Sequence, residues 1–245
     1  MGRCIYLRKG EVHTSPVVGI QASDLPIGQI VKLMEGGVAT EFIVVNQGIP
    51  ENSGLYDASC NGTWLLRKDI KSDSVWNSNS VNTYPDSNTT IRLYLEGDYF
   101  NSLGVTEQNT VKQVKIPYGA GGGAATVFSG AGGYSTKVFL LGGYEVGYTT
   151  TIISDIPVDG AKLGYFIVGS DNEANKKRIA LYENNATAWW LRSPSTSSSE
   201  SNRGYRINNA GKYAKASVGG NFGARPALII PSTARFNKNT LLLKG

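Results

Sequence analysis

Trp189-Trp190-Leu191-Arg192-Ser193-Pro194 and Gly223-Ala224-Arg225-Pro226-Ala227-Leu228-Ile229-Ile230 are the two stretches that decide the fold of this chain. Adjacent tryptophans in a strand point to opposite faces, so each ring needs buried surroundings of its own. Arg192 and Arg225 each stand at the end of an apolar run, where a planar fork of five donors can tie loop carbonyls together. We therefore expect the following residues to be rigid structural anchors: Trp189, Trp190, Arg192, Arg225 and Pro226.

The segment between these anchors, residues 195–222, is built almost entirely from Ser, Asn, Gly, Ala, Lys, Arg and Tyr. Polar loops that are held by a rigid scaffold are a common place for binding residues. This arrangement predicts a surface segment stretched between two fixed points.

Length and composition indicate a soluble chain rich in strands and turns. Its 245 residues include 30 Gly and 13 Tyr but only 2 Met, which favours strands and turns over helices. No apolar run approaches the ~18 residues of a membrane span, and the first residues lack the apolar core of a signal peptide. We expect synthesis in the cytoplasm of the producing cell and no membrane span.

The net charge of +5 is concentrated near the carboxyl end. Residues 195–245 carry eight Lys or Arg against Glu200 alone. Such a surface attracts anionic polymers, although a solvated face is the simpler interpretation. A nucleic-acid site is not expected, because aromatic side chains are not interleaved with the charges as single-strand binding requires.

The residues that usually carry catalysis or hold metals are sparse. Cys4 and Cys60 are far apart with no CxxC spacing, and His13 is the only histidine. These counts argue against a zinc site, a disulfide framework and a Ser-His-Asp or Cys-His arrangement. We therefore predict no enzyme activity, no catalytic residues and no cofactor.

Two further motifs have simpler interpretations than ligand binding. Residues 119–133 are rich in glycine but contain no GxxxxGK[ST], so a mobile surface loop is favoured over a phosphate-binding loop. A group of acidic residues lies in turns with no regular ligand spacing, which favours a solvated loop over a calcium site. These acidic residues are Asp155, Asp159, Asp171 and Glu173.

The chain divides into an extended arm, residues 1–22, and a body, residues 23–245. The arm contains strand-like residues without a partner strand of its own, which predicts an assembly or attachment element. In the body, residues 29–46 predict a β-hairpin, and a helix broken near Gly97 is predicted from about 89 to 103. We expect an α+β fold of short antiparallel strands and long loops with one or two helices.

The two anchor stretches together resemble the WWLRSP…YGVRPAL signature of a largely uncharacterised domain family in bacteria and their phages. The resemblance covers roughly residues 24–231 and includes further landmarks upstream. These are Trp64-Leu-Leu-Arg-Lys-Asp69, Trp76-Asn77, Ile91-Arg92, Leu95, Tyr99-Phe-Asn-Ser-Leu103 and Lys137-Val-Phe-Leu-Leu141. That family is similar to the C-type-lectin-like fold of formylglycine-generating enzymes and of the variable proteins of diversity-generating retroelements. The resemblance therefore implies a C-type-lectin-like domain.

In such variable proteins, the segment between the Trp-Trp strand and the Arg-Pro strand carries the diversified ligand-binding residues. The resemblance thus implies a variable surface within residues 195–222. Its members here are Asn202, Arg203, Tyr205, Arg206, Asn208, Lys212, Tyr213, Ala214, Lys215, Ser217 and Asn221. The segment is poor in aromatic anchors, with Tyr205 and Tyr213 as the main candidates. The cysteine pair of the related oxidases has no counterpart after Cys60, so their chemistry is not expected.

The function implied is that of a non-enzymatic receptor- or ligand-binding protein, phage-encoded and displayed on a virion tail or surface. Its expected partners are a host-cell surface protein or glycan through residues 195–222 and other virion or tail proteins through residues 1–22. A homo-oligomer, with a trimer favoured, would gain avidity from weak sites. The alternative is a structural or decoration protein of the virion with no specific ligand.

Overall fold

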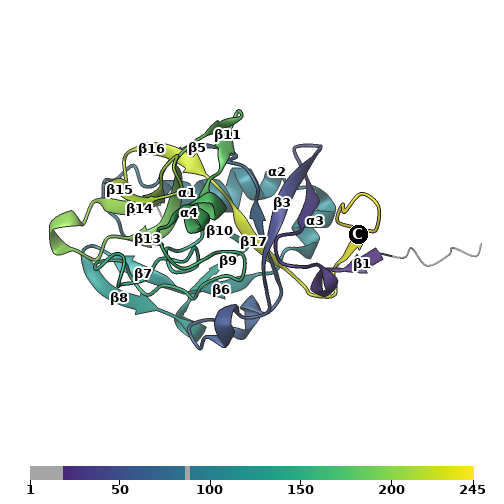
Figure 1. Cartoon of the computed structure of the whole chain (residues 1–245), viewed down its shortest axis with the longest axis horizontal. Coiled ribbons are helices and arrows are strands. Elements are labelled where there is room, and N and C mark those ends of the chain that lie inside the picture. The colour runs from purple at the N-terminus through teal and green to yellow at the C-terminus, as the bar shows by residue number, and fades with distance from the viewer. Residues whose placement is uncertain (1–18, 86–88) are drawn as a thin grey trace, which may run out of the picture.

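The computed structural model of the chain describes residues 19–85 and 89–245 (Figure 1). Most of the expected arm, residues 1–18, lies outside the described residues. Its last part is not a free extension, because β1 (Gly19–Gln21) pairs with β18 (Arg235–Asn237) and Ala22 is fully buried. The body therefore begins a few residues before the expected boundary.

The first large sheet has five antiparallel strands, and its central strands are buried on both faces. Its strands, in spatial order, are β10 (Val138–Phe139), β17 (Ala227–Ile230), β4 (Thr63–Arg67), β3 (Val38–Gln47) and β2 (Ile30–Glu35). Alternate residues enter two different hydrophobic cores, as Trp64 and Leu65 illustrate on β4. The predicted hairpin of residues 29–46 is confirmed as the β2–β3 pair, in which Ile30 lies opposite Ile43.

The second large sheet carries the Trp-Trp strand at its centre. Its strands, in spatial order, are β15 (Tyr213–Ser217), β14 (Arg203–Ile207), β13 (Trp189–Pro194), β16 (Asn221–Ala224) and β5 (Ser72–Val75). β13 and β16 are parallel, with Trp189 opposite Gly223, and the other neighbours are antiparallel. Strands β14 and β15 lie at one end of the long axis of the molecule, and β1 and the carboxyl terminus lie at the other (Figure 1).

The two tryptophans of β13 are buried on opposite faces, as their adjacency predicted. Trp189 belongs to one core cluster and Trp190 to the other, and neither has exposed surface. Each indole N–H has a backbone acceptor, the carbonyl of Arg178 for Trp189 and that of Ser74 for Trp190, both at 2.9 Å. The strand therefore joins the two cores.

The glycine-rich stretch is an ordered hairpin, so the expectation of a mobile loop is wrong. It forms β7 (Tyr118–Gly121) and β8 (Ala124–Phe128), joined by a turn in which Gly121, Gly122 and Gly123 have positive φ. A Cβ atom on Gly121 would lie 1.9 Å from the carbonyl oxygen of Asn82. The glycines therefore permit a tight turn against neighbouring backbone.

Two further small sheets and several short helices complete the fold. The sheets are β6 (Val114–Ile116) with β9 (Tyr134–Thr136), and β11 (Leu181–Tyr182) with β12 (Asn185–Ala186). The α-helices are α1 (Thr90–Tyr94), α2 (Phe100–Ser102), α3 (Val105–Thr110) and α4 (Asn172–Arg178). The 3-10 turns are η1 (Ala22–Asp24), η2 (Pro50–Asn52), η3 (Ala58–Cys60), η5 (Gly130–Gly132) and η6 (Ser198–Glu200).

The predicted break near Gly97 is a widened turn within one helical run. A π-helical segment, η4 (Leu95–Tyr99), connects α1 directly to α2. The helical run packs Ile91, Leu95 and Tyr99, spaced four residues apart, into the core cluster that contains Trp190. We call this cluster the second core. In residues 19–85 and 89–245, no helix has the length and apolar character needed to cross a membrane.

The observed architecture corrects the expected fold class. Strands account for 35% and helices for 18% of the described residues, so the fold is mostly β and the expected α+β class is wrong; a C-type-lectin-like fold is not confirmed. The expected class was wrong because pairing between segments gives the chain more strand than its apolar spacing predicts. The glycine-rich hairpin is one example, since its residues have no helical or strand periodicity of their own.

Candidate functional site

Most of the expected binding residues lie on one hairpin, β14–β15, where β15 is the edge strand of its sheet. Tyr205 lies opposite Lys215, and Arg206 lies opposite Ala214. Successive side chains of a strand point to opposite faces. The residues that were expected to share one surface are therefore divided between the two faces of the hairpin.

The expected binding residues also differ in how far they are buried. The exposed members are Asn202, Arg203, Lys212, Tyr213, Ser217 and Asn221. The half-buried members are Arg206, Asn208, Ala214 and Lys215. Tyr205 is fully buried. One of the two expected aromatic anchors therefore belongs to the core, and Tyr213, with 38% of its surface exposed, is the one that faces solvent.

A polar cluster under the hairpin holds it to two neighbouring loops. Lys215 Nζ lies 2.5 Å from Asp155 Oδ2 and 2.5 Å from Glu200 Oε2. The Tyr205 hydroxyl donates to Asp155 Oδ1 at 2.7 Å, and Ser195 Oγ lies within 2.9 Å of both carboxylates. We call these residues the hairpin clamp: Asp155, Ser195, Glu200, Tyr205 and Lys215. The clamp ties strands β14 and β15 to the loop that contains Asp155 and to the segment from Ser195 to Glu200.

The shifted pKa values of Asp155 and Lys215 keep both side chains charged at neutral pH. Burial opposes the ionisation of Asp155, but hydrogen bonds from Lys215, Tyr205 and Ser195 lower its pKa to about 2. Desolvation also acts against the charged form of Lys215, yet the two carboxylates raise its pKa above the usual value. Because Lys215 stays protonated, it has no free electron pair with which to activate the Ser195 hydroxyl. The clamp therefore acts as a structural element.

Arg206 occupies the opposite face of the hairpin. Its guanidinium carbon lies 4.3 Å from the centre of the Phe222 ring, which packs edge-on against Trp190 at 5.0 Å. Burial lowers the pKa of Arg206, and its Nε has no hydrogen-bond partner among the residues that the structure describes. The Arg206 side chain is thus stacked over the second core and does not lie with Tyr213.

The two anchor arginines tie loop carbonyls together, as the sequence predicted. Arg192 donates to the carbonyls of Pro117, Leu140 and Asp159 at 2.9, 3.0 and 2.5 Å. Arg225 donates to the carbonyls of Arg67 and Lys68 at 2.9 and 2.8 Å. Both arginines are buried, as are the other expected anchors, Trp189, Trp190 and Pro226.

Sequence reasoning missed the acidic partner of Arg192. Glu145 forms a two-pronged ion pair with Arg192, and Tyr56 donates to the same carboxylate at 2.9 Å. Desolvation disfavours the charged guanidinium, but Glu145 more than offsets this and raises the pKa of Arg192. Asp159 accepts from Ser193 beside this pair, and burial raises its pKa to about 6. A lone glutamate in the apolar, glycine-rich stretch 142–147 was the one available signal.

A family model described as Domain of unknown function (DUF6273) matches residues 61–232. The chain belongs to the DUF6273 family. No curated protein and no solved structure matches the chain. The DUF6273 match runs from just before β4 to just after β17, so it includes both anchor stretches, the hairpin and its clamp.

The acidic residues that were weighed as calcium ligands have other partners in this DUF6273 domain. Asp155 belongs to the clamp, and Asp159 accepts from Ser193. Asp171 caps α4 by accepting from the Ala174 amide at 2.8 Å, and Glu173 pairs with Lys176. In the described part of the chain, no three His, Cys, Asp or Glu residues stand close enough to hold a metal ion.

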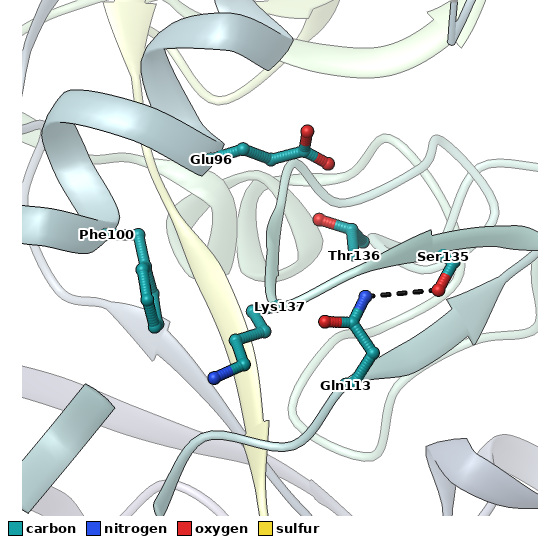
Figure 2. A pocket seen from close by; sticks show the side chains of 6 residues that line it. All are labelled: Glu96, Phe100, Gln113, Ser135, Thr136 and Lys137. Atoms are coloured by element: carbon teal, nitrogen blue, oxygen red, sulfur yellow. Dashed lines mark hydrogen bonds between the residues drawn. The ribbon is translucent and has the colours of Figure 1, made fainter. Parts of the chain in front are cut away.

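A polar cavity of about 270 Å³ lies between the η4–α2 helical run and strand β9 (Figure 2). Its polar side chains already have partners. Gln113 donates to Ser135 at 3.1 Å, and the Lys137 ammonium sits 4.7 Å from the centre of the Phe100 ring. Glu96 is paired with Arg92 at 3.1 Å. Because the polar groups that line this cavity already interact with other side chains, the cavity is a weaker candidate for ligand binding.

Proposed function

We propose that this chain is a non-enzymatic ligand-binding protein that recognises a host-cell component through the outer surface of the β14–β15 hairpin. The proposal is supported by one contrast: the inner side of the hairpin is held in place, while three of its side chains, which we call the rim, are exposed. The clamp and the anchors hold the hairpin, while Arg203, Lys212 and Tyr213 project from it to solvent. Rigid support for exposed side chains lowers the entropy that binding must overcome.

The chemistry of the rim supports a polar or anionic partner on a cell surface, either a protein or a glycan. Tyr213 offers an aromatic platform, since its ring is held edge-on against the buried Tyr148 at 5.4 Å. Lys212, the neighbouring residue in the chain, adds positive charge beside it, and Arg203 adds positive charge at the other end of the paired strands. A tyrosine platform next to a cation is suited to sugars and acidic side chains. Weak sites of this kind gain strength when several copies act together.

Display on a virion tail or surface, as a homo-oligomer, remains part of this proposal. It is supported by the position of the hairpin at the end of the molecule opposite β1 (Figure 1). An attachment through the amino-terminal side would leave the hairpin facing outward. A structural protein of the virion without a specific ligand is the alternative, and it predicts assembly without cell binding.

The test is binding of the fluorescently labelled full chain to intact bacterial cells and to a glycan array. A triple variant, Arg203→Ala, Lys212→Ala and Tyr213→Ala, should lower the bound signal by at least about ten-fold at an unchanged melting temperature. The matched control replaces one arginine, one lysine and one aromatic residue elsewhere: Arg235→Ala, Lys238→Ala and Phe128→Ala. Equal binding by the triple variant and the wild type refutes a role for the hairpin. Absence of binding by every form favours the structural alternative.

A further inference from the structure

An apolar cavity of about 390 Å³ lies beside the first large sheet, away from the polar cavity described above. Its apolar walls come from the sheet and from the chain between Tyr165 and β11, and they are Ile30, Ile43, Tyr165, Ile179 and Leu181. Ile179 and Leu181 each keep 36% of their surface exposed, so this wall of the cavity is in contact with solvent. Contact between apolar side chains and water is unfavourable, and a partner that covers them removes this cost.

The apolar surface continues beyond the cavity. Ile27 is 44% exposed, and its Cδ1 atom lies 2.5 Å from the place that a Cβ atom on Gly164 would take, directly before the tyrosine of the cavity wall. Ile167 is 41% exposed, and its carbonyl accepts from Arg178 at 3.1 Å, in the residue just before Ile179. Single exposed apolar residues are common, whereas a group of neighbouring ones marks an interaction site. We call this group the lateral face: Ile27, Tyr165, Ile167, Ile179 and Leu181.

The charged side chains that line the cavity do not favour a strongly charged partner. Each of them interacts favourably with a side chain of opposite sign: Lys68 with Glu41 at 2.6 Å, Lys176 with Glu173 at 2.7 Å, and Arg225 with Asp69. Partners of opposite charge attract one another and partners of like charge repel. With its charges paired within the chain, this surface neither attracts a polyanion nor repels a second copy of itself.

The position of the lateral face also fits a second copy of the chain. Helix α4 and strand β11, which contribute to the cavity, lie between the β14–β15 hairpin at one end of the long axis and β1 at the other (Figure 1). Copies that meet through this middle part can stand side by side with their hairpins at the same end. Contact through the lateral face therefore leaves both ends of the molecule open.

We infer that the lateral face is a contact between copies of this chain, in which apolar side chains of one copy cover the exposed isoleucines and leucine of the other. The driving force is the removal of apolar surface from water, worth about 25 cal/mol per Å². The inference gives a location to the homo-oligomer that is part of the function proposed above, on which it rests to that extent. Its test needs no ligand.

Sedimentation velocity of the full chain, between about 1 and about 100 μM, measures the oligomeric state. We expect a mass of at least two chains at the upper end of this range, with half of the chains assembled below about 20 μM. A chain that is still monomeric at about 100 μM overturns the inference. That result would leave the lateral face to a different protein or to a small organic molecule.

Variants locate the contact. Ile179→Lys combined with Leu181→Lys places two charges in the apolar contact, and it should raise the concentration needed for assembly by at least about ten-fold. The matched control is Leu93→Lys combined with Val105→Lys, at exposed apolar positions outside the lateral face, and it should assemble as the wild type does. Assembly of the Ile179→Lys, Leu181→Lys chain at wild-type concentrations overturns the inference.

A second variant keeps the test decisive if the first does not fold. Ile27→Lys changes an exposed residue from a different segment of the lateral face, and it should weaken assembly in the same direction. Unchanged assembly by a folded Ile27→Lys chain then overturns the inference. Because cell binding does not enter these measurements, an assembling chain that binds no cells refutes the hairpin proposal alone, and a cell-binding monomer refutes the lateral contact alone.

Discussion

Arg192 and Glu145 form a two-pronged ion pair, at 2.5 and 2.7 Å, in which neither side chain has exposed surface. The pair joins the Trp-Trp strand to the 142–147 turn, 47 positions earlier in the chain. A buried pair is costly to break, because removal of one partner leaves the other charge unpaired in a low-dielectric interior. This pair therefore makes the signature arginine a structural residue.

Glu145→Gln tests the importance of this pair for stability. Because Arg192 would then remain charged and buried, we expect the free energy of unfolding to fall by about 3–5 kcal/mol. Urea unfolding followed by tryptophan fluorescence measures the change. The control is Glu173→Gln in the exposed pair with Lys176, expected to cost under about 1 kcal/mol. Similar losses in the two variants would contradict the central role of the buried pair.

The hairpin clamp should make stability depend on acid in a defined range. The pKa of Asp155 is lowered from 3.8 to about 2, so its contribution is complete above about pH 4 and is lost as the pH falls toward 2. Lys215→Met should raise the pKa of Asp155, cost about 1–2 kcal/mol at pH 7 and start acid unfolding at a higher pH. Melting temperatures between pH 2 and 7 measure this. Lys212→Met, at an exposed position, should reproduce the wild-type curve, and a Lys215→Met curve that does the same would refute the clamp.

Tyr205 and Tyr213 should separate stability from binding. Tyr205→Phe removes a hydrogen bond to a charged acceptor, which predicts a loss of about 1.5–3 kcal/mol in unfolding free energy with cell binding retained. Tyr213→Ala should do the opposite, because its ring is exposed and its loss removes the aromatic platform. Paired melting and cell-binding measurements give both readouts. If Tyr205→Phe lost binding at full stability, the assignment of the two tyrosines would be reversed.

If the surface is diversified, natural variation should follow exposure and not the whole segment 195–222. Deep sequencing of this gene in its native population should find substitutions at Arg203, Lys212, Tyr213 and other exposed positions, at adenine-derived codons. Tyr205 and Lys215 should stay fixed, because replacement of either opens the clamp. Uniformly low variation would indicate a fixed surface, and variation at Tyr205 equal to that at Tyr213 would contradict the structural division.

The sequence could predict the features that depend on local backbone geometry. The opposite burial of Trp189 and Trp190 follows from the alternation of side chains along any strand. The β2–β3 hairpin follows from two apolar runs around Gly36 and Gly37, and the role of Arg192 follows from the number of its donors. Each of these inferences needs only a few neighbouring residues.

The sequence could not predict which polar residues would meet across the fold. Resemblance placed Tyr205 and Tyr213 together on a binding surface, and the two lie on the same face of the hairpin in strands that pair directly. What separates them is burial: Tyr205 has no exposed surface and donates to Asp155, 50 positions earlier in the chain, whereas Tyr213 is exposed. The mostly β character has a similar origin, because pairing between distant segments decided it.

The sequence by itself therefore determined the anchors, the alternation of the Trp-Trp strand and the segment that carries the candidate surface. Only the tertiary structure decided which residues of that segment face solvent and which acid neutralises Arg192. The physical reason is that strand alternation and donor number are properties of a short stretch of chain. Burial and charge pairing depend instead on how segments that are far apart in the sequence pack together, and no short stretch of chain predicts those contacts.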